Sequence, residues 1–266
     1  MKNAHMKQLV LVLLILSMLM LSLTGCAVNS EPLSTTDSTT GTLSESISES
    51  EPVLDAHEEW VKSNVVSWGL GKNFIDYVGN NRDYEWYVDQ ALTGDHAGAN
   101  CGPSSVEMAG RWADATFDQT AENARSKFRP LGGWWYSDDI TGSLEAFDID
   151  YEVVDIKDAY TLRNIIDSGR IAIVNNTMNG IPLVSDDASR VNRFYSFDSG
   201  HYFIVKGYVL VDNLTYFEVY DPNNWEMTYD DGQEKGKDRY YESAVLLNSI
   251  LGWYPYAVII NPSESN

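Results

Sequence analysis

Hydrophobic residues are distributed along the chain in three different patterns. Residues 9–23 form an unbroken apolar run, "LVLVLLILSMLMLSL". Residues 27–52 are rich in Ser, Thr and Glu and contain no aromatic residue, lysine or arginine. From Val53 onward, apolar positions recur at the spacings typical of helices and strands. The chain therefore divides into segments 1–26, 27–52 and 53–266, of which only the third can bury a sizeable core.

Helical spacing dominates the first half of the third segment. Trp60, Val61, Val65 and Trp68 predict a helix within 53–79, interrupted near Gly69. Residues 104–115 predict a second helix, which Ser104 or Ser105 can cap. Three further stretches have the apolar spacing and boundary signals of helices, at 138–149, 158–170 and 240–253.

Strand patterns dominate the second half. Residues 200–211 and 214–222 are rich in β-branched and aromatic residues and are joined by "DN", which predicts a hairpin. Shorter strands are expected at 151–156, 171–177 and 254–261. Because helices come first and strands follow, we predict an α+β domain in which N-terminal helices pack on an antiparallel sheet.

The N-terminal segment has the features of a secretory signal. Lys2 and Lys7 precede the apolar run, which is shorter than the roughly 20 residues of a membrane span. The residues "LTGC", ending at Cys26, resemble the lipobox of bacterial lipoproteins, which implies cleavage before Cys26 and attachment of lipid, including palmitate, to that cysteine. An ordinary signal peptide or a membrane anchor is the alternative.

Composition limits the partners that the exported part can have. Residues 27–52 cannot bury enough apolar surface to fold, so we expect a flexible tether between the lipid and the domain. The formal charge of the whole chain is −21, and Lys2 and Lys7 are the only charged residues of 1–26. Such acidity argues against nucleic acid and against direct binding to anionic lipid. We expect a monomer at the extracytoplasmic face of a bacterial membrane.

A single cysteine remains in the third segment once Cys26 is assigned to the lipid. Cys101 stands in "HAGANCGPSS", at or just before the first turn of the helix predicted at 104–115. The positive end of a helix dipole favours a thiolate, which is the nucleophilic form of cysteine. A buried structural cysteine is the alternative, but the polar residues before Cys101 favour the nucleophile.

A thiolate nucleophile needs a base that is stable as a cation beside it. His201 opens the long strand 200–211 and would be rigidly held there. His57, on the polar face of the first helix, and His96, in the loop before Cys101, are the other candidates. His5 lies in the signal segment.

Two further side chains can complete such a site. Asp221 ends the strand that follows His201, and adjacent antiparallel strands bring the start of one beside the end of the other. Its carboxylate could therefore orient the imidazole, although Asp-Pro is otherwise a common turn. The oxyanion of an acyl transfer needs donors, and the Cys101 backbone N–H and the upstream Gln90 amide can supply them.

These residues together resemble a known family. "Q…CGPSS…M", "GHYFIVKGY" and "VYDPNN" are similar to the C39-like branch of the papain-like cysteine peptidases, over about Trp86 to Asn261. The resemblance implies a papain-like fold, Gln90 as the oxyanion-hole donor, Cys101 as the nucleophile, His201 as base and acid, and Asp221 as the orienting carboxylate. The gap between Gln90 and Cys101 is longer than we expect for the family, so "ALTGDHAGAN" is interpreted as a small insertion.

The resemblance implies a thiol peptidase acting on a peptide or protein substrate without a cofactor. The better-known members cut leader peptides after double glycine within exporters, and no transporter segment accompanies this domain, so that substrate is not transferred. A cell-wall amidase or transpeptidase using the same triad and an inactive surface binding module are the alternatives. Trp134 and Trp135 could line a cleft or pack in the core. Residues 229–238 are interpreted as a solvated acidic loop rather than a calcium site.

Overall fold

The computed structural model describes residues 55–263, and in this part the chain is built around one antiparallel sheet of seven strands. The strand order is β2-β7-β3-β4-β5-β6, and β1 pairs with the far half of β4. The strands are β1 Phe74–Gly79, β2 Tyr151–Asp155, β3 Ile171–Thr177, β4 Gly200–Val211, β5 Leu214–Tyr220, β6 Arg239–Glu242 and β7 Tyr256–Ile260. The predicted signal and lipobox at 1–26 and the predicted tether at 27–52 lie outside the described residues.

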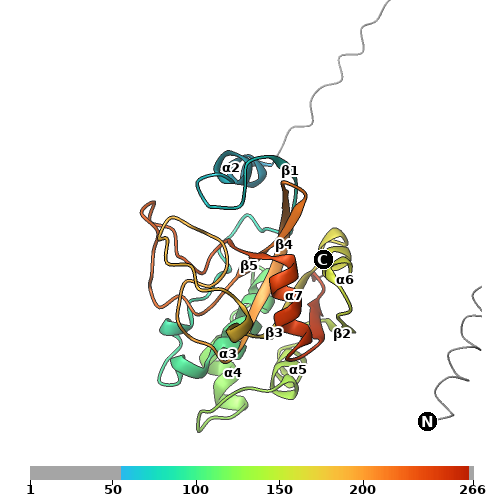
Figure 1. The fold of residues 1–266 in the computed structure, drawn as a ribbon. Helices are drawn as coiled ribbons and strands as arrows, with labels where there is room; N and C mark the ends of the chain where they lie inside the picture. The colour runs from blue at the N-terminus through green and yellow to red at the C-terminus, as the bar shows by residue number, and fades with distance from the viewer. Residues whose placement is uncertain (1–54, 264–266) are drawn as a thin grey trace, which may run out of the picture. The chain divides into compact units, whose positions relative to one another are not determined.

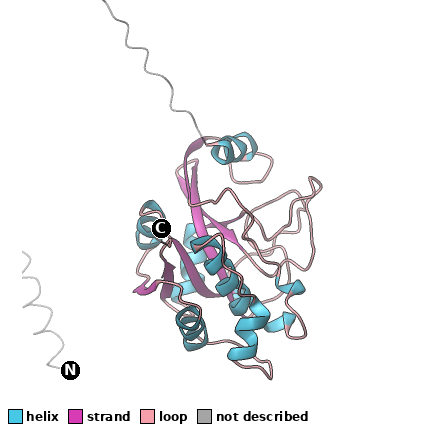
Figure 2. Ribbon diagram, turned by 180° about the vertical axis from the view of Figure 1, so that it is seen from behind, coloured by secondary structure: helices cyan, strands magenta, loops and turns pink. Residues whose placement is uncertain are grey.

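Helices cover both faces of this sheet (Figures 1 and 2). One face carries α3 Cys101–Ala113 and α5 Ser137–Ala146, with α4 Ala121–Lys127 beside α3. The other face carries α6 Ala159–Asp167 and α7 Ser243–Leu251. The helix α2 Ala56–Asn64 packs with β1 at one end of the sheet, at the top of Figure 1. Short 3₁₀ turns occupy Gln90–Leu92, Ala97–Ala99 and Met178–Gly180.

The strand periodicity explains why both faces are apolar. Successive side chains of a strand point to opposite faces. In β3, Ile171 and Ile173 pack with α3, whereas Ala172 and Val174 pack with α6 and α7. Strands β4 and β7 alternate in the same way, so the central strands contain continuous buried apolar runs, such as 171–174 in β3 and 202–205 in β4. Continuous apolar runs of this kind are expected for strands buried on both faces.

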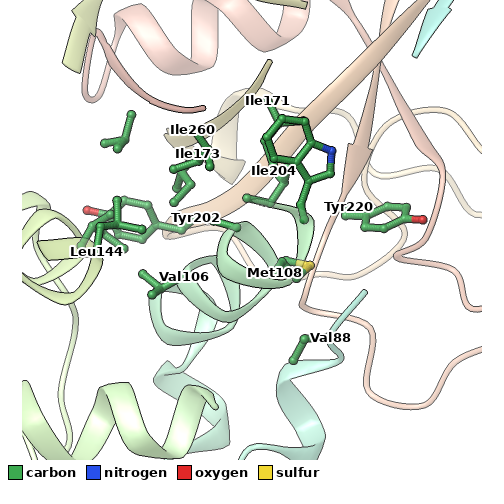
Figure 3. Packing of buried hydrophobic residues seen from close by; sticks show 14 of the residues in the cluster. Val88, Val106, Met108, Leu144, Ile171, Ile173, Tyr202, Ile204, Tyr220 and Ile260 are labelled. Atoms are coloured by element: carbon green, nitrogen blue, oxygen red, sulfur yellow. The ribbon is translucent and has the colours of Figure 1, made fainter. Parts of the chain in front are cut away.

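The core beneath α3 holds the functional region in place. Val106 and Met108 of α3 belong to the same buried cluster as Ile173 and Ile204 of the sheet (Figure 3). All four side chains are at most 1 % exposed. Burying side chains of this size stabilises the fold by roughly 1.5–3 kcal/mol each. The α3 helix is therefore fixed against β4, the strand that carries His201.

The α+β class and the antiparallel sheet are confirmed. The predicted hairpin is formed by β4 and β5, and its two loop residues, Asp212 and Asn213, have φ values of 51° and 65°. Positive φ at both central positions is what a two-residue hairpin turn of this kind requires.

Three local predictions were wrong. Residues 74–79 form strand β1 rather than the end of a helix, because they pair with β4. Residues 240–242 belong to strand β6 and not to the helix that follows. The α3 helix begins three residues before Ser104, after Asn100, so Ser104 and Ser105 do not cap it; the Ser105 hydroxyl instead donates to the Cys101 carbonyl.

Among residues 55–263, no helix combines the length and the apolar character needed to cross a bilayer.

Candidate active site

Cys101 is the first residue of α3 and lies close to the sheet. Its side chain is only 7 % exposed. Backbone N–H groups of Gly102 and Tyr202 point at the sulfur and stabilise its charged form. A Cβ at Gly102 would lie 3.1 Å from the Trp135 side chain, a tight contact that glycine avoids. The sequence "CGP" therefore allows a tryptophan to pack directly over the start of the helix.

His201 is the second residue of β4 and faces Cys101. Its imidazole and the thiol line the same cavity, and each shifts the pKa of the other. Burial alone would raise the pKa of Cys101, but interaction with the His201 ring and its positive charge lowers it below its usual value. Burial would likewise lower the pKa of His201, but the Asp221 carboxylate and the sulfur raise it to about 10. Both directions favour a thiolate–imidazolium pair.

Asp221 follows β5 directly and is fully buried. Its Oδ1 lies 2.7 Å from His201 Nε2, so the other ring nitrogen, Nδ1, is left to face the thiol. The hydroxyls of Tyr195 and Tyr241 donate to Oδ2 at 2.7 and 2.9 Å, and the Asn223 N–H donates to Oδ1 at 3.0 Å. Burial would raise the pKa of Asp221, but His201 and these donors lower it, which keeps the carboxylate ionised.

Gln90 lies in the same cavity as Cys101 and His201. Its Nε2 is 3.3 Å from Asn223 Oδ1, and its backbone N–H donates to the Pro222 carbonyl. Gln90 is therefore attached to the loop that follows Asp221. The structure thus brings together all four residues that were predicted from the sequence.

Asp89 connects the Gln90 segment to the loop that follows Asp221. Its carboxylate accepts the backbone N–H groups of Trp225 and Glu226 at 3.1 and 2.6 Å, and the amide of Asn224 at 3.2 Å. Trp225 and Glu226 both have positive φ, at 55° and 57°. Left-handed conformations cost roughly 1–2 kcal/mol per non-glycine residue. The buried Asp89 carboxylate offsets that cost and joins Gln90 to the loop.

The segment between Gln90 and Cys101 folds back on itself. Asn100 donates through Nδ2 to the Thr93 carbonyl and hydroxyl, both at 2.9 Å, and Thr93 in turn donates to the Gln90 carbonyl. Arg125 of α4 donates to Asn100 Oδ1 and to the Ala99 carbonyl at 2.8 and 2.7 Å. These contacts hold the two ends of the segment together, and this keeps Gln90 near Cys101.

The other two histidines of the described chain lie away from the thiol. His96 packs against Gly132, where a Cβ would come within 2.8 Å of its Nδ1, and it does not line the cavity of Cys101. His57 Nε2 is 2.9 Å from Glu218, at the α2 end of the sheet. His57, Glu218 and Asp238 could in principle hold a metal ion, but Lys206 Nζ lies 2.8 Å from both carboxylates and already supplies the positive charge.

Two cavities meet at Cys101. One, of about 220 Å³, is lined by Gln90, His201, Asn223 and Trp225. The other, of about 380 Å³, lies beside Trp134, Tyr202 and Trp253. Trp134 lines both of them. For Trp135 the sequence allowed either a cleft or a core position. The side chain is 5 % exposed, and it both lines the larger cavity and packs in the core.

Sequence reasoning missed the residues that support this site. Asp89, Asn223 and Arg125 are ordinary polar residues in the sequence, and their importance comes only from burial and partners in space. Tyr195 and Tyr241 are two of the 16 tyrosines, and neither stands near a motif. The one available signal was adjacency, because Asp89 precedes Gln90 and Asn223 closes "YDPNN".

A buried cysteine at a helix start, with a histidine at the start of β4 and a carboxylate directly after β5, has the residue types and the arrangement that nucleophilic thiol chemistry requires. The chain belongs to the Peptidase_C39 like family, whose pattern matches residues 83–245. No curated protein matches the chain.

Three solved structures are similar to the chain at low sequence identity. The first is a C39-like peptidase from Bacillus anthracis, at 12 % identity and TM-score 0.48, covering 72 % of this chain and 100 % of that one. The second is UfSP from C. elegans, at 12 % identity and TM-score 0.44, covering 75 % of this chain and 37 % of that one. The third is a digestive procathepsin L2 proteinase from Tenebrio molitor, at 14 % identity and TM-score 0.36, covering 74 % of this chain and 66 % of that one.

Proposed function

We propose that this cysteine peptidase hydrolyses peptide bonds through a triad of Cys101, His201 and Asp221, with Gln90 as an oxyanion donor. The observation that carries the proposal is the 2.7 Å contact from His201 Nε2 to Asp221 Oδ1, made by an imidazole that lines the same cavity as Cys101. Family membership supplies the class of reaction.

The proposed chemistry has two steps. The Cys101 sulfur attacks the peptide carbonyl carbon, and the oxyanion that forms accepts hydrogen bonds from the Cys101 N–H and Gln90 Nε2. Collapse breaks the C–N bond, and His201 gives its proton to the leaving amine. Water then attacks the thioester while His201 takes its proton, and the acid product leaves with the thiolate restored. Asp221 stays ionised throughout and stabilises the imidazolium.

Replacing the nucleophile tests the proposal. Cys101→Ala should abolish hydrolysis of casein or of a fluorogenic peptide mixture, while Ser105→Ala, one helical turn away, should keep measurable activity. Digestion of purified peptidoglycan by the same preparation separates the alternatives. Release of wall peptides without cleavage of unfolded protein would replace the peptidase proposal with a wall amidase or transpeptidase. Unchanged turnover in Cys101→Ala would contradict thiol chemistry altogether.

We further propose that the domain, residues 53–266, is held at the outer face of a bacterial membrane by a lipid on Cys26 and the tether 27–52. The support is the apolar run followed by "LTGC" and the composition of the tether. Cells labelled with radioactive palmitate should yield a labelled wild-type protein that sediments with membranes. Cys26→Ser should be unlabelled. Equal labelling of the two proteins would contradict the anchor and leave the peptidase proposal intact.

A further inference from the structure

The larger cavity beside Cys101 has a lining unlike that of the catalytic side. Besides Cys101 it is lined by six aromatic residues, of which Trp135 and Tyr202 are buried and the other four form its rim. The remaining lining residues are Gly200 and uncharged polar residues, so the lining contains no Asp, Glu, Lys or Arg. The aromatic rim consists of Trp134, Tyr136, Trp253 and Tyr254. Trp134, Tyr136 and Trp253 are 50 %, 59 % and 54 % exposed, which is unusual for rings of this size.

The start of β4 is shaped so that one of these rings can lie over it. A Cβ at Gly200 would come within 2.8 Å of the Trp253 indole. The glycine before His201 therefore gives Trp253 direct access to the strand, and any other residue would push the ring away. The indole forms a wall of the cavity immediately beside the catalytic histidine's strand.

The chemistry of the proposed reaction assigns the two cavities to the two halves of the substrate. The leaving amine must reach the imidazolium that protonates it, and the His201 ring lines the smaller cavity but not the larger one. Cys101 lines both, because the carbonyl that it attacks lies between the two halves. The residues on the acyl side of the scissile bond are thus directed toward the larger cavity.

We propose that this cavity binds a bulky apolar side chain, aromatic or large aliphatic, within two residues on the acyl side of the scissile bond. A volume of about 380 Å³ is in the range of small-ligand pockets, and aromatic walls without charge favour an uncharged guest. A pair of glycines would leave the aromatic walls uncovered. This inference rests on the proposed peptidase function and names the substrate class of that site.

Three buried polar atoms of the residues that line the cavity have no hydrogen-bond partner among residues 55–263, namely Trp135 Nε1, Asn175 Oδ1 and Tyr202 OH. Polar atoms of this kind support a peptide guest, and Asn175 Oδ1 is the carbonyl acceptor among them. Asn175 lies on β3 opposite Tyr202 and lines the cavity. An unpaired buried acceptor costs about 1–3 kcal/mol, and a substrate backbone N–H would relieve that cost. A pure hydrocarbon guest would leave it unpaired.

Alkylation of Cys101 tests the inference without requiring turnover. Three dipeptidyl chloromethyl ketones are compared, with Gly-Gly, Gly-Phe or Phe-Gly next to the reactive carbon. The thiolate forms a C–S bond to the methylene carbon and chloride leaves. We expect at least one phenylalanine reagent to react about tenfold or more faster than the Gly-Gly reagent, as apolar contacts in a fitted pocket allow.

Matched variants distinguish binding in the larger cavity from the reactivity of the Cys101 thiol. In Trp253→Ala the advantage of phenylalanine should fall severalfold, whereas Tyr160→Ala, which removes an aromatic ring that is 69 % exposed on α6, should retain it. Iodoacetamide, which is too small to use the cavity, should react at the same rate with all three proteins.

The outcomes distinguish the inference from the function on which it rests. If iodoacetamide reacts normally and the Gly-Gly reagent is as fast as both phenylalanine reagents, or if Trp253→Ala keeps the phenylalanine advantage, the acyl-side assignment is wrong and the peptidase proposal survives. If the rate of iodoacetamide labelling rises with pH only around a midpoint of about pH 8.5, the thiol is ordinary. The peptidase proposal then fails, and the acyl-side assignment fails with it.

Discussion

The imidazole Nε2 of His201 lies 2.7 Å from Oδ1 of Asp221, a carboxylate that is fully buried. The other carboxylate oxygen receives two tyrosine hydroxyls, from Tyr195 and Tyr241. An isolated buried carboxylate would take up a proton, but this one is satisfied on every side and stays charged. The tyrosine pair therefore acts on the thiol through two intermediates, the carboxylate and the imidazole.

Removal of the two tyrosine hydroxyls is expected to lower the activity that we propose for His201 as base and acid. A hydrogen bond to a charged group is worth about 1.5–3 kcal/mol, so Tyr195→Phe or Tyr241→Phe should lower kcat by roughly tenfold and the double variant by more. An Asp221 carboxylate that shares less of its charge with hydroxyls attracts the imidazolium more strongly, so the alkaline limit of activity should move to higher pH. Tyr160→Phe is the control. Reduced kcat with an unmoved alkaline limit would show a purely structural role.

Gln90 can be tested by comparing two reactions of the same thiol. Hydrolysis develops an oxyanion, and removing one donor from such a site costs about 10²–10³ in kcat. Alkylation by iodoacetamide develops no oxyanion. Gln90→Ala should therefore lose hydrolysis by that factor and retain its alkylation rate. Equal losses in both reactions would mean that Gln90 supports the thiolate or the fold instead.

The hydrogen bonds of Asp89, which hold the Gln90 segment to the loop after Asp221, lead to a related expectation. Asp89→Asn keeps the shape of the side chain but weakens the acceptor of the Trp225 and Glu226 N–H groups. Hydrolysis should fall by about tenfold, since a hydrogen bond to a charged group contributes about 1.5–3 kcal/mol. Combined with Gln90→Ala, the Asp89→Asn change should cost little more, because both act on one donor. Additive losses in a double-mutant cycle would contradict this coupling.

The pH dependence follows from the two shifted groups. The pKa of Cys101 is lowered, so the thiolate is lost only as the pH falls below its usual range. The pKa of His201 is raised to about 10, so its proton is available to the leaving amine until the pH rises past that value. Hydrolysis should therefore be flat through neutral pH and fall above about 10, whereas alkylation of the thiol should stay high there. In Asp221→Asn the alkaline fall should move toward neutral pH, because the attraction that raises the His201 pKa is removed.

A buried charge cluster at the α2 end of the sheet gives a stability prediction. Lys206 occupies the bulge of β4 opposite β5, and its ammonium lies 2.8 Å from Glu218 and from Asp238. Burial would raise the pKa of Glu218, but Lys206 and His57 lower it well below its usual range. A depressed carboxyl pKa contributes stability above the unfolded value of about 4.3, and this stability is lost as the pH falls further.

Glu218→Gln should destabilise the domain by about 3–5 kcal/mol, because it leaves Lys206 buried with one partner fewer. The Tm should fall by about 6–20 °C, and stability should depend less on pH between about 5 and 3. Glu59→Gln, on the exposed surface of α2, should change stability by less than about 0.5 kcal/mol. Urea unfolding followed by tryptophan fluorescence measures both. A loss below about 1 kcal/mol in Glu218→Gln would show that solvent reaches the cluster.

The sequence determined the class of fold and predicted a nucleophilic thiol at the start of α3. Apolar periodicity predicted α3, α5, α6 and the hairpin of β4 and β5, because those patterns record which side of an element is buried. "CGPSS", "GHYF" and "YDP" stood out because their residue types are adjacent in the chain. The errors at β1 and β6 have a shared cause, since both strands are short and owe their form to pairing with a distant partner.

Only the tertiary structure decided how Gln90 comes near Cys101 and what surrounds the thiol. The contacts that bring the glutamine back run through Thr93, Asn100 and Arg125, and the last of these comes from a helix that no local pattern predicted. The tyrosines on Asp221 and the aromatic walls beside Cys101 likewise come from segments far apart in the chain. Hydrophobic periodicity is a local property and can be read from the sequence, whereas the partner of a buried polar group is set by packing across the whole domain.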